Sequence, residues 1–167
     1  MAALADKIRR LEAATSNLLA LRAEIEAGAP WPLAEVYGPE PEASWGPPEL
    51  LAHVEEYLRY WMGEIERVLD GRGDDVVPFG RVATDEIRIG VIGRDRTLPF
   101  REIFARIEGE SARVARRLGE LDEAEAGRRG LHPTRGEMTI REMTEPFLVG
   151  HTEGHVTQLR EILAAAH

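Results

Sequence analysis

The sequence contains no cysteine. This absence excludes disulfide bonds, metal sites built on thiolates, and a cysteine nucleophile belonging to the protein itself. Any chemistry that uses a thiol must therefore receive that thiol from another molecule. The sequence also lacks GxGxxG, Walker and GxSxG motifs, the usual signatures of dinucleotide-binding, phosphate-binding and serine-hydrolase sites.

Long apolar runs are absent as well. No segment approaches the roughly eighteen consecutive apolar residues that suggest a membrane-spanning helix. The first residues, MAALADKIRRLEAATSNLL, carry charges throughout and contain no apolar core of a secretory signal. With 43% apolar and 31% charged residues, the composition is that of a soluble globular protein, and 167 residues suit one domain. We therefore expect a single cytoplasmic domain over residues 1–167, with no membrane partner.

Positive charge is scarce. Lys and Arg together number 21 against 30 Asp and Glu, which gives a net charge of −9 at pH 7. A nucleic-acid partner requires a basic patch that neutralises phosphates, and here the arginines are scattered along the chain. The sequence therefore predicts no nucleic-acid partner.

What the chain does contain is helical periodicity. Apolar residues share one face in four long stretches, which predict helices over residues 4–27, 47–69, 99–121 and 140–165. A capping box starts the last helix, with Thr139 as N-cap and Glu142 three positions later. Pro146 lies inside this helix and predicts a kink about one turn before His151.

Residues 71–98 form a long crossover between the second and third predicted helices. Within it, TDEIRIGVIG is interpreted as a short helix with Thr84 as N-cap. VVPF, residues 76–79, is the best strand fragment, and it is short. Four amphipathic helices with one long connection predict an all-α fold, a four-helix bundle.

Two histidines, His151 and His155, lie four residues apart in the last predicted helix. At about 100° per residue, both fall about 20° from the centre of its apolar stripe, while Thr152, Glu153 and Gly154 point elsewhere. An unsatisfied polar group in a bundle core costs about 1–3 kcal/mol. One metal ion bound to both rings would remove that cost, and neutral imidazole is a good ligand for Zn, Ni or Fe. The alternative is two core histidines hydrogen-bonded to neighbouring side chains.

Two histidines hold a metal weakly, so a third ligand is expected. His53 lies in the second predicted helix, about 90° from the centre of its apolar stripe, from where it could turn toward a neighbouring helix. His132 is the other candidate, in a segment, RGLHPTRGE, whose Gly and Pro predict a turn. HTEGH is not the HExxH of zinc proteases, because Glu153 lies about 200° from His151. The paired Glu-x-x-His motifs of di-iron bundles are absent.

Three segments of the chain resemble the DinB-like superfamily, which is related to the N-terminal domains of maleylpyruvate isomerases. They are WGPPELLAHVEEYLRYW, TDEIRIGVIGRDRTLPFREIFARIEGESARV and GLHPTRGEMTIREMTEPFLVGHTEGHVTQLREIL, and together they cover most of residues 45–163. The third is the most specific, because a His-Pro…Gly turn precedes a helix carrying HxxxHxxQL. The resemblance implies an up-down-down-up four-helix bundle with a long crossover between helices 2 and 3.

The same resemblance implies a metal site formed by His53, His151 and His155. It implies that His132 is either a structural residue or a residue that contacts the metal ligands without binding the metal. Pro146 departs from the family pattern, which puts the geometry of the ligand helix in question. Family members often dimerise, so a homodimer is one expected assembly.

Members of this superfamily include metal-dependent transferases and isomerases that use mycothiol, bacillithiol or glutathione. The resemblance therefore implies an enzyme in which a low-molecular-weight thiol attacks an electrophilic small-molecule substrate at a divalent metal ion (Zn, Ni, Fe or Mn). A metal-dependent small-molecule hydrolase and a non-enzymatic metal-binding stress-response module are the alternatives. Arg81, Arg88 and Arg94 in the crossover are either carboxylate-binding residues or solvated surface charges.

Overall fold

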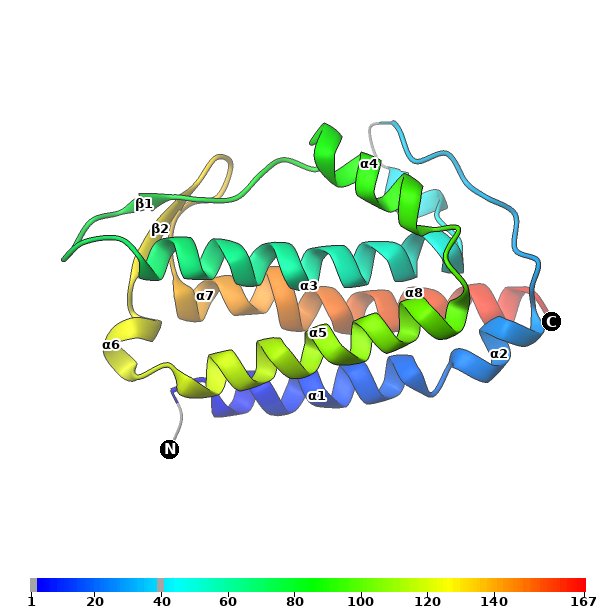
Figure 1. Cartoon of the computed structure of the whole chain (residues 1–167), viewed down its shortest axis with the longest axis horizontal. Coiled ribbons are helices and arrows are strands. Elements are labelled where there is room, and N and C mark those ends of the chain that lie inside the picture. The colour runs from blue at the N-terminus through cyan, green and yellow to red at the C-terminus, as the bar shows by residue number, and fades with distance from the viewer. Residues whose placement is uncertain (1–2, 39–40) are drawn as a thin grey trace.

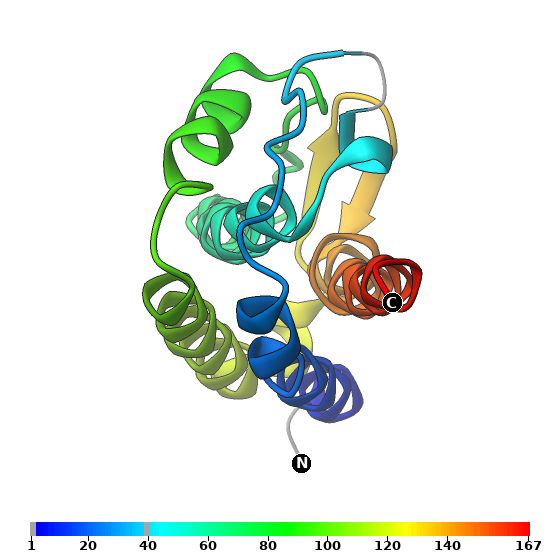
Figure 2. The ribbon, with the colours of Figure 1, turned by 90° about the vertical axis from the view of Figure 1, so that its right-hand side faces the viewer.

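The computed structural model describes residues 3–38 and 41–167. The chain is mostly helical, as predicted, and four long helical segments lie side by side (Figure 2). Their main helices are α1 (Ala5–Leu19), α3 (Pro47–Leu69), α5 (Phe100–Glu120) and α8 (Gly150–Ala165). α3 contacts α5 and α8, and α1 contacts the same two helices from the other side. α3 and α5 run in one direction, and α1 and α8 run in the other (Figure 1).

The first predicted helix, residues 4–27, is divided in two. α1 ends at Leu19, and α2 occupies Arg22–Ala27. At the break, the N–H of Leu21 donates to the carbonyl of Leu18, only three residues back, at 3.0 Å. This tighter turn ends the α-helical pattern and turns the chain, so the prediction of one continuous helix was wrong.

The crossover contains the predicted short helix, α4 (Glu86–Asp95). Its N-cap is Asp85 rather than the predicted Thr84, because the Asp85 carboxylate accepts a hydrogen bond from the N–H of Arg88 at 2.9 Å. The predicted strand fragment is present as β1 (Val77–Pro78).

A small sheet joins the crossover to the segment before the last helix. β1 pairs in parallel with β2 (Arg129–His132), and β2 pairs in antiparallel fashion with β3 (Gly136–Thr139). The short helix α6 (Glu123–Ala126) precedes this hairpin. Neither the hairpin nor α6 was predicted from the sequence.

The last predicted helix has three parts. α7 (Ile140–Thr144) starts at the predicted capping box, where the Thr139 side chain accepts from the N–H of Glu142. The π-helical turn η2 (Glu145–Val149) follows and leads into α8, with the N–H of Gly150 donating to the carbonyl of Glu145, five residues back. Pro146 cannot donate a backbone hydrogen bond, so the α-helical pattern is interrupted there. The predicted kink is therefore a π turn.

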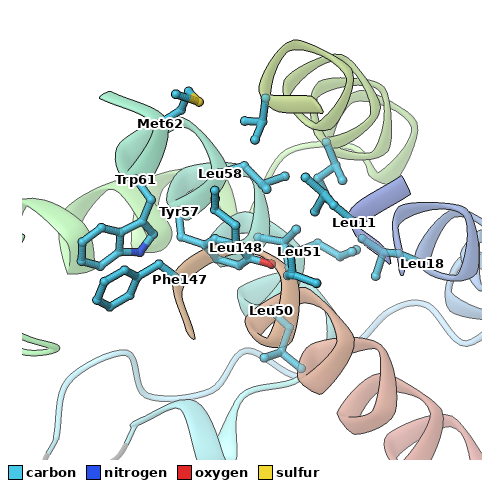
Figure 3. Packing of buried hydrophobic residues seen from close by; sticks show 14 of the residues in the cluster. Leu11, Leu18, Leu50, Leu51, Tyr57, Leu58, Trp61, Met62, Phe147 and Leu148 are labelled. Atoms are coloured by element: carbon cyan, nitrogen blue, oxygen red, sulfur yellow. The ribbon is translucent and has the colours of Figure 1, made fainter. Parts of the chain in front are cut away.

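Leucine and aromatic side chains from all four long segments fill the core (Figure 3). Leu11 and Leu18 of α1 belong to the same core cluster as Leu51 and Leu58 of α3, and all four are fully buried. Among the described residues, no helix has the length and apolar character required to cross a membrane.

Candidate metal centre

Three histidines meet between α3 and α8. His53 on α3 and His151 on α8 place their Nε2 atoms 3.2 Å apart. The ring of His155 lies one turn further along α8, with its centroid 4.6 Å from that of His151. One ligand atom from each histidine and one from Glu42 all lie within 4.8 Å of one another. The structure thus brings together the three side chains predicted as ligands and adds a carboxylate.

His53 is 1% exposed, although the sequence placed it at the edge of an apolar stripe. α3 is packed against α4 and α5 as well as α8, so its edge positions are covered too. Trp45 and Tyr57 contact the His53 ring edge-on, with centroids 5.5 and 5.1 Å away. Trp45 reaches this position because the 3₁₀ turn η1 (Pro41–Ser44) leads directly into the start of α3.

The two α8 histidines lie on one flank of the buried face rather than at its centre. Thr152, predicted to point elsewhere, is 1% exposed. Its Oγ1 donates to the carbonyl of Leu148 at 2.7 Å and is hydrogen-bonded to the hydroxyl of Tyr57. The π turn adds a residue to the helix and therefore rotates α8 by roughly one residue step, about 100°, relative to a continuous α-helix. This rotation corrects the predicted helix phase and leaves the histidine flank facing α3.

A neighbouring side chain determines which nitrogen of His155 carries the proton. Nδ1–H of His155 donates to Oε1 of Gln158 at 3.1 Å, and Nε2 of Gln158 donates to the main-chain carbonyl of Glu42 at 2.8 Å. Nε2 of His155 therefore has a free lone pair. This atom is buried without a hydrogen-bond partner in the described part of the chain. A cation bound by the cluster would satisfy it, and Nε2 of His53 and Nε2 of His151 lie side by side in the same cluster, so the donor set fits a divalent metal ion.

The electrostatics of the cluster favour neutral rings. Burial lowers the pKa of His53 well below its usual value, and the neighbouring histidines lower it further. Burial followed by repulsion from His155 lowers the pKa of His151 to about 3. Burial also lowers the pKa of His155, against the opposing effect of Glu42. Neutral imidazole is the form that binds metals, so protons compete weakly for these ligands near pH 7.

A pocket of about 430 Å³ opens beside the cluster, and His53, His151 and Glu42 border it. Trp61 and Phe147 form an aromatic part of the wall, with their rings stacked 3.9 Å apart (Figure 3). Phe147 belongs to the π turn, which therefore shapes the pocket as well as the phase of α8. The volume lies within the range of small-molecule sites, about 300–1,000 Å³.

Three arginines border the same pocket, namely Arg81, Arg88 and Arg135. Arg81 donates to the Glu56 carboxylate at 2.7 Å and lies 3.6 Å above the Tyr60 ring. Arg88 is buried and pairs with the Glu42 carboxylate. Of the three crossover arginines considered as either carboxylate-binding or surface residues, Arg81 and Arg88 therefore border the pocket.

The remaining predicted residues lie outside the cluster. Arg94 is 68% exposed, pairs with Asp95 and does not border the pocket. His132 borders the pocket from the end of β2, and its Nδ1 accepts from the main-chain N–H groups of Thr134 and Arg135, each at 3.2 Å. His132 thus stabilises the hairpin turn and is not part of the ligand cluster, in keeping with a structural position.

A sequence model of the DinB superfamily matches residues 7–159. The chain belongs to the DinB superfamily. No curated protein and no solved structure gives a significant match. All three clustered histidines lie within the part of the chain that matches this DinB-superfamily model.

Two residues of this DinB-superfamily site were missed by the sequence analysis. Glu42 comes from a loop rich in Pro and Gly, where no periodicity indicates which way a side chain points. Its Oε1 nonetheless lies 3.4 Å from Nε2 of His53. Arg135 comes from the turn after His132, and the only local signal was the HPTRG sequence of that turn.

Proposed function

We propose that this DinB-superfamily protein is a metal-dependent enzyme that transfers a low-molecular-weight thiol to an electrophilic small molecule. The observation that carries the proposal is a cluster of three buried imidazoles, His53, His151 and His155, beside a pocket of about 430 Å³. The absence of cysteine fits a thiol that comes from outside. In this proposal residues 1–167 form one domain, and the long helices form the up-down-down-up bundle of the superfamily.

Each residue has a separate task in the proposed reaction. A divalent ion held by His53, His151 and His155 would supply a positive charge that favours the thiolate form of a bound thiol. Gln158 keeps His155 in the tautomer whose Nε2 is free. The Glu42 carboxylate lies beside this set and would accept the thiol proton. Arg88 holds the Glu42 carboxylate in place through their ion pair.

The position of Glu42 also favours a second candidate, a metal-dependent small-molecule hydrolase. A carboxylate beside a metal-bound water can act as its general base. The two functions share the site and differ in whether a thiol is consumed. Turnover of ester or amide substrates in thiol-free buffer would favour the hydrolase.

The first experiment is a measurement of metal content by mass spectrometry on tag-free protein purified without chelator. We expect about one equivalent in the wild type and little in the double variant His151→Ala/His155→Ala, by the ligand chemistry of neutral imidazole. His167→Ala is the matched control, because His167 is 73% exposed. No metal in the wild type, even after reconstitution with Zn, Ni, Fe and Mn, would overturn the proposal.

The second experiment tests thiol transfer. Wild type, the double variant and His167→Ala are incubated with mycothiol, bacillithiol or glutathione and a panel of electrophiles. Thioether products are then measured by liquid chromatography and mass spectrometry. We expect products above background with wild type and His167→Ala only. Equal rates in all three proteins would contradict the transferase proposal.

A further inference from the structure

The pocket is bordered by an arginine, Arg135, that pairs with no acidic side chain among residues 3–38 and 41–167. Arg135 is exposed on the turn between β2 and β3, and its guanidinium carbon lies 5.3 Å above the ring of Phe147. Its side chain forms no ion pair with any residue that the structure describes, whereas Arg81 and Arg88 are paired with carboxylates. A chain of net charge −9 thus places at the pocket a cation that none of its described carboxylates pairs with.

His132 adds a hydrogen-bond donor beside this charge. Its Nδ1 accepts two main-chain N–H bonds, so the proton of the neutral ring is on Nε2. Nε2–H has no hydrogen-bond partner among the residues described here. His132 is 5% exposed and borders the pocket, so this donor is nearly buried and still next to the pocket. Gly80 leaves room for this ring, since a Cβ there would lie 2.9 Å from Nε2.

The two donors come from one short hairpin turn, and the ring of Phe147 contacts both residues. The His132 ring stacks on Phe147 with centroids 5.3 Å apart, and Arg135 lies over the same ring. Arg135 and His151 border the same pocket, and the Arg135 charge makes a small contribution to the lowered pKa of His151. An anion held at the turn would therefore lie in the same pocket as the histidine cluster.

We propose that Arg135 and Nε2–H of His132 form a subsite that binds a carboxylate of the small-molecule ligand. The rest of that molecule extends past Phe147 toward His53 and His151. This inference rests on the proposed function in one respect, namely that the bound acid is the substrate or the thiol of the reaction. It adds the class of ligand, a small molecule with a carboxylate at one end and its reacting atom at the other.

The number of donors selects a carboxylate over a phosphate. A guanidinium presents a planar fork of N–H groups that matches the two oxygens of a carboxylate. His132 supplies a single further donor, and the other arginines are already engaged by Glu42 and Glu56. A phosphate dianion carries more charge than one unmatched arginine can neutralise.

The test is an NMR titration of the full-length protein after treatment with a chelator, so that no metal can bind the probe. The probes are 3-phenylpropanoate, its neutral analogue 3-phenylpropanamide, and phenyl phosphate. The proteins are wild type, Arg135→Gln and the control Arg129→Gln, which removes an arginine from the same hairpin. Arg129 is suitable because it is 49% exposed, pairs with the exposed Glu137 and does not border the pocket.

We expect 3-phenylpropanoate to bind wild type and Arg129→Gln alike, and Arg135→Gln at least about tenfold more weakly, the usual effect of losing a charge-assisted hydrogen bond. The amide should bind all three proteins equally weakly. The Nε2–H resonance of His132 should be present and should shift when the carboxylate is added. Equal carboxylate affinity in Arg135→Gln, a preference for phenyl phosphate, or a His132 ring protonated on Nδ1 would each overturn the proposal.

This test is independent of the metal. Carboxylate binding that depends on Arg135, in a protein that takes up no metal, would preserve the subsite and contradict the proposed enzyme. Metal uptake without carboxylate binding would support the proposed metal site and contradict the carboxylate subsite. The metal content of Arg135→Gln should equal that of wild type, because Arg135 is not part of the ligand cluster.

Discussion

At the scale of single residues, the candidate centre depends on the hydrogen bonds that orient its imidazoles. Gln158 is the residue best suited to a test of this dependence, because it connects two segments of the site. It accepts from Nδ1 of His155 and donates to the carbonyl of Glu42. The carboxylate of Glu42 is held in turn by Arg88. One amide therefore fixes a ring orientation and also the position of the turn that carries the carboxylate.

We predict that Gln158→Leu weakens metal binding by about 10–100-fold, the usual cost of losing a group that orients a ligand. Leucine preserves the helix but cannot accept the hydrogen bond that Nδ1–H of His155 donates. Competition against a fluorescent chelator measures the affinity. Glu161→Gln is the control, since Glu161 is exposed on the same helix. An unchanged affinity in Gln158→Leu would show that the helix alone orients His155.

The pKa of His151 predicts how the stability of the metal-free protein varies with pH. The pKa of His151 is about 3 in the folded protein and about 6.5 in an unfolded chain. Between these values the unfolded state binds the extra proton. This contribution to stability is therefore complete above pH 6.5 and is lost as the pH falls toward 3.

We predict that the free energy of unfolding falls by about 1.4 kcal/mol per pH unit for His151 alone between pH 6 and pH 4.5. Urea denaturation of chelator-treated protein measures this slope. His151→Leu should show a slope that is shallower by that amount. Parallel slopes in the two proteins would mean that His151 is protonated in the folded state.

At the scale of secondary-structure elements, the sequence predicted what local periodicity and capping determine. The helix over residues 47–69 and the cap at Thr139 are as predicted. The hairpin was missed because packing rather than pattern fixes it. Gly130, for example, lies so close to Phe79 that a Cβ would be 2.5 Å from that ring. Such contacts join segments far apart in sequence and leave no periodic signal.

The π turn explains why the sequence singled out histidines that the structure brings together, while it gave the wrong helix phase for them. A residue's type can be read from the sequence, but its direction on α8 depends on the number of residues per turn before it. Pro146 indicated an interruption and could not indicate its form. For the same reason Thr152 was predicted to point elsewhere than the buried face, and it is buried against Tyr57.

Because of the π turn, Gly150 and Gly154 of α8 differ in the space available for a side chain. A Cβ on Gly150 would lie 3.0 Å from the carbonyl oxygen of Glu145, whereas a Cβ on Gly154 would meet nothing within 4 Å. We predict that Gly154→Ala stabilises the protein by about 0.5–1 kcal/mol through helix propensity. Gly150→Ala should gain less or lose stability. Urea denaturation compares the two, and equal gains would mean that the turn relaxes without cost.

At the scale of the whole molecule, salt bridges connect α1 to η2 and α8. Arg10 donates to the carboxylates of both Glu145 and Glu153, and Lys7 also contacts Glu145. These pairs are part-buried and form a network across α1, η2 and α8, which makes them more significant than isolated surface pairs. The histidine cluster lies on a different flank of α8 and connects it to α3. Helix α8, which carries two of the candidate ligands, is therefore held from two sides.

This arrangement predicts that metal binding stabilises the whole fold. His53 and His151 are 98 residues apart in the chain, so the ligands are dispersed when the protein unfolds. Free zinc at a hundredfold excess over its Kd should add about 2.7 kcal/mol, since it binds only the folded state. For a domain of this size, we expect the Tm to rise by about 5–10 °C. Differential scanning calorimetry at increasing zinc concentration measures the change.

The double variant His151→Ala/His155→Ala should show no such rise, while His167→Ala should follow the wild type. A Tm independent of zinc in all three proteins would contradict the metal centre. Combined with the thiol-transfer screen, the rise in Tm also separates a metal-dependent enzyme from a metal-binding module without activity. A large zinc-dependent rise together with inactivity in the thiol screen would favour a metal-stabilised binding module. A rise accompanied by thiol transfer would mean that the same ion stabilises the bundle and serves the reaction in the adjoining pocket.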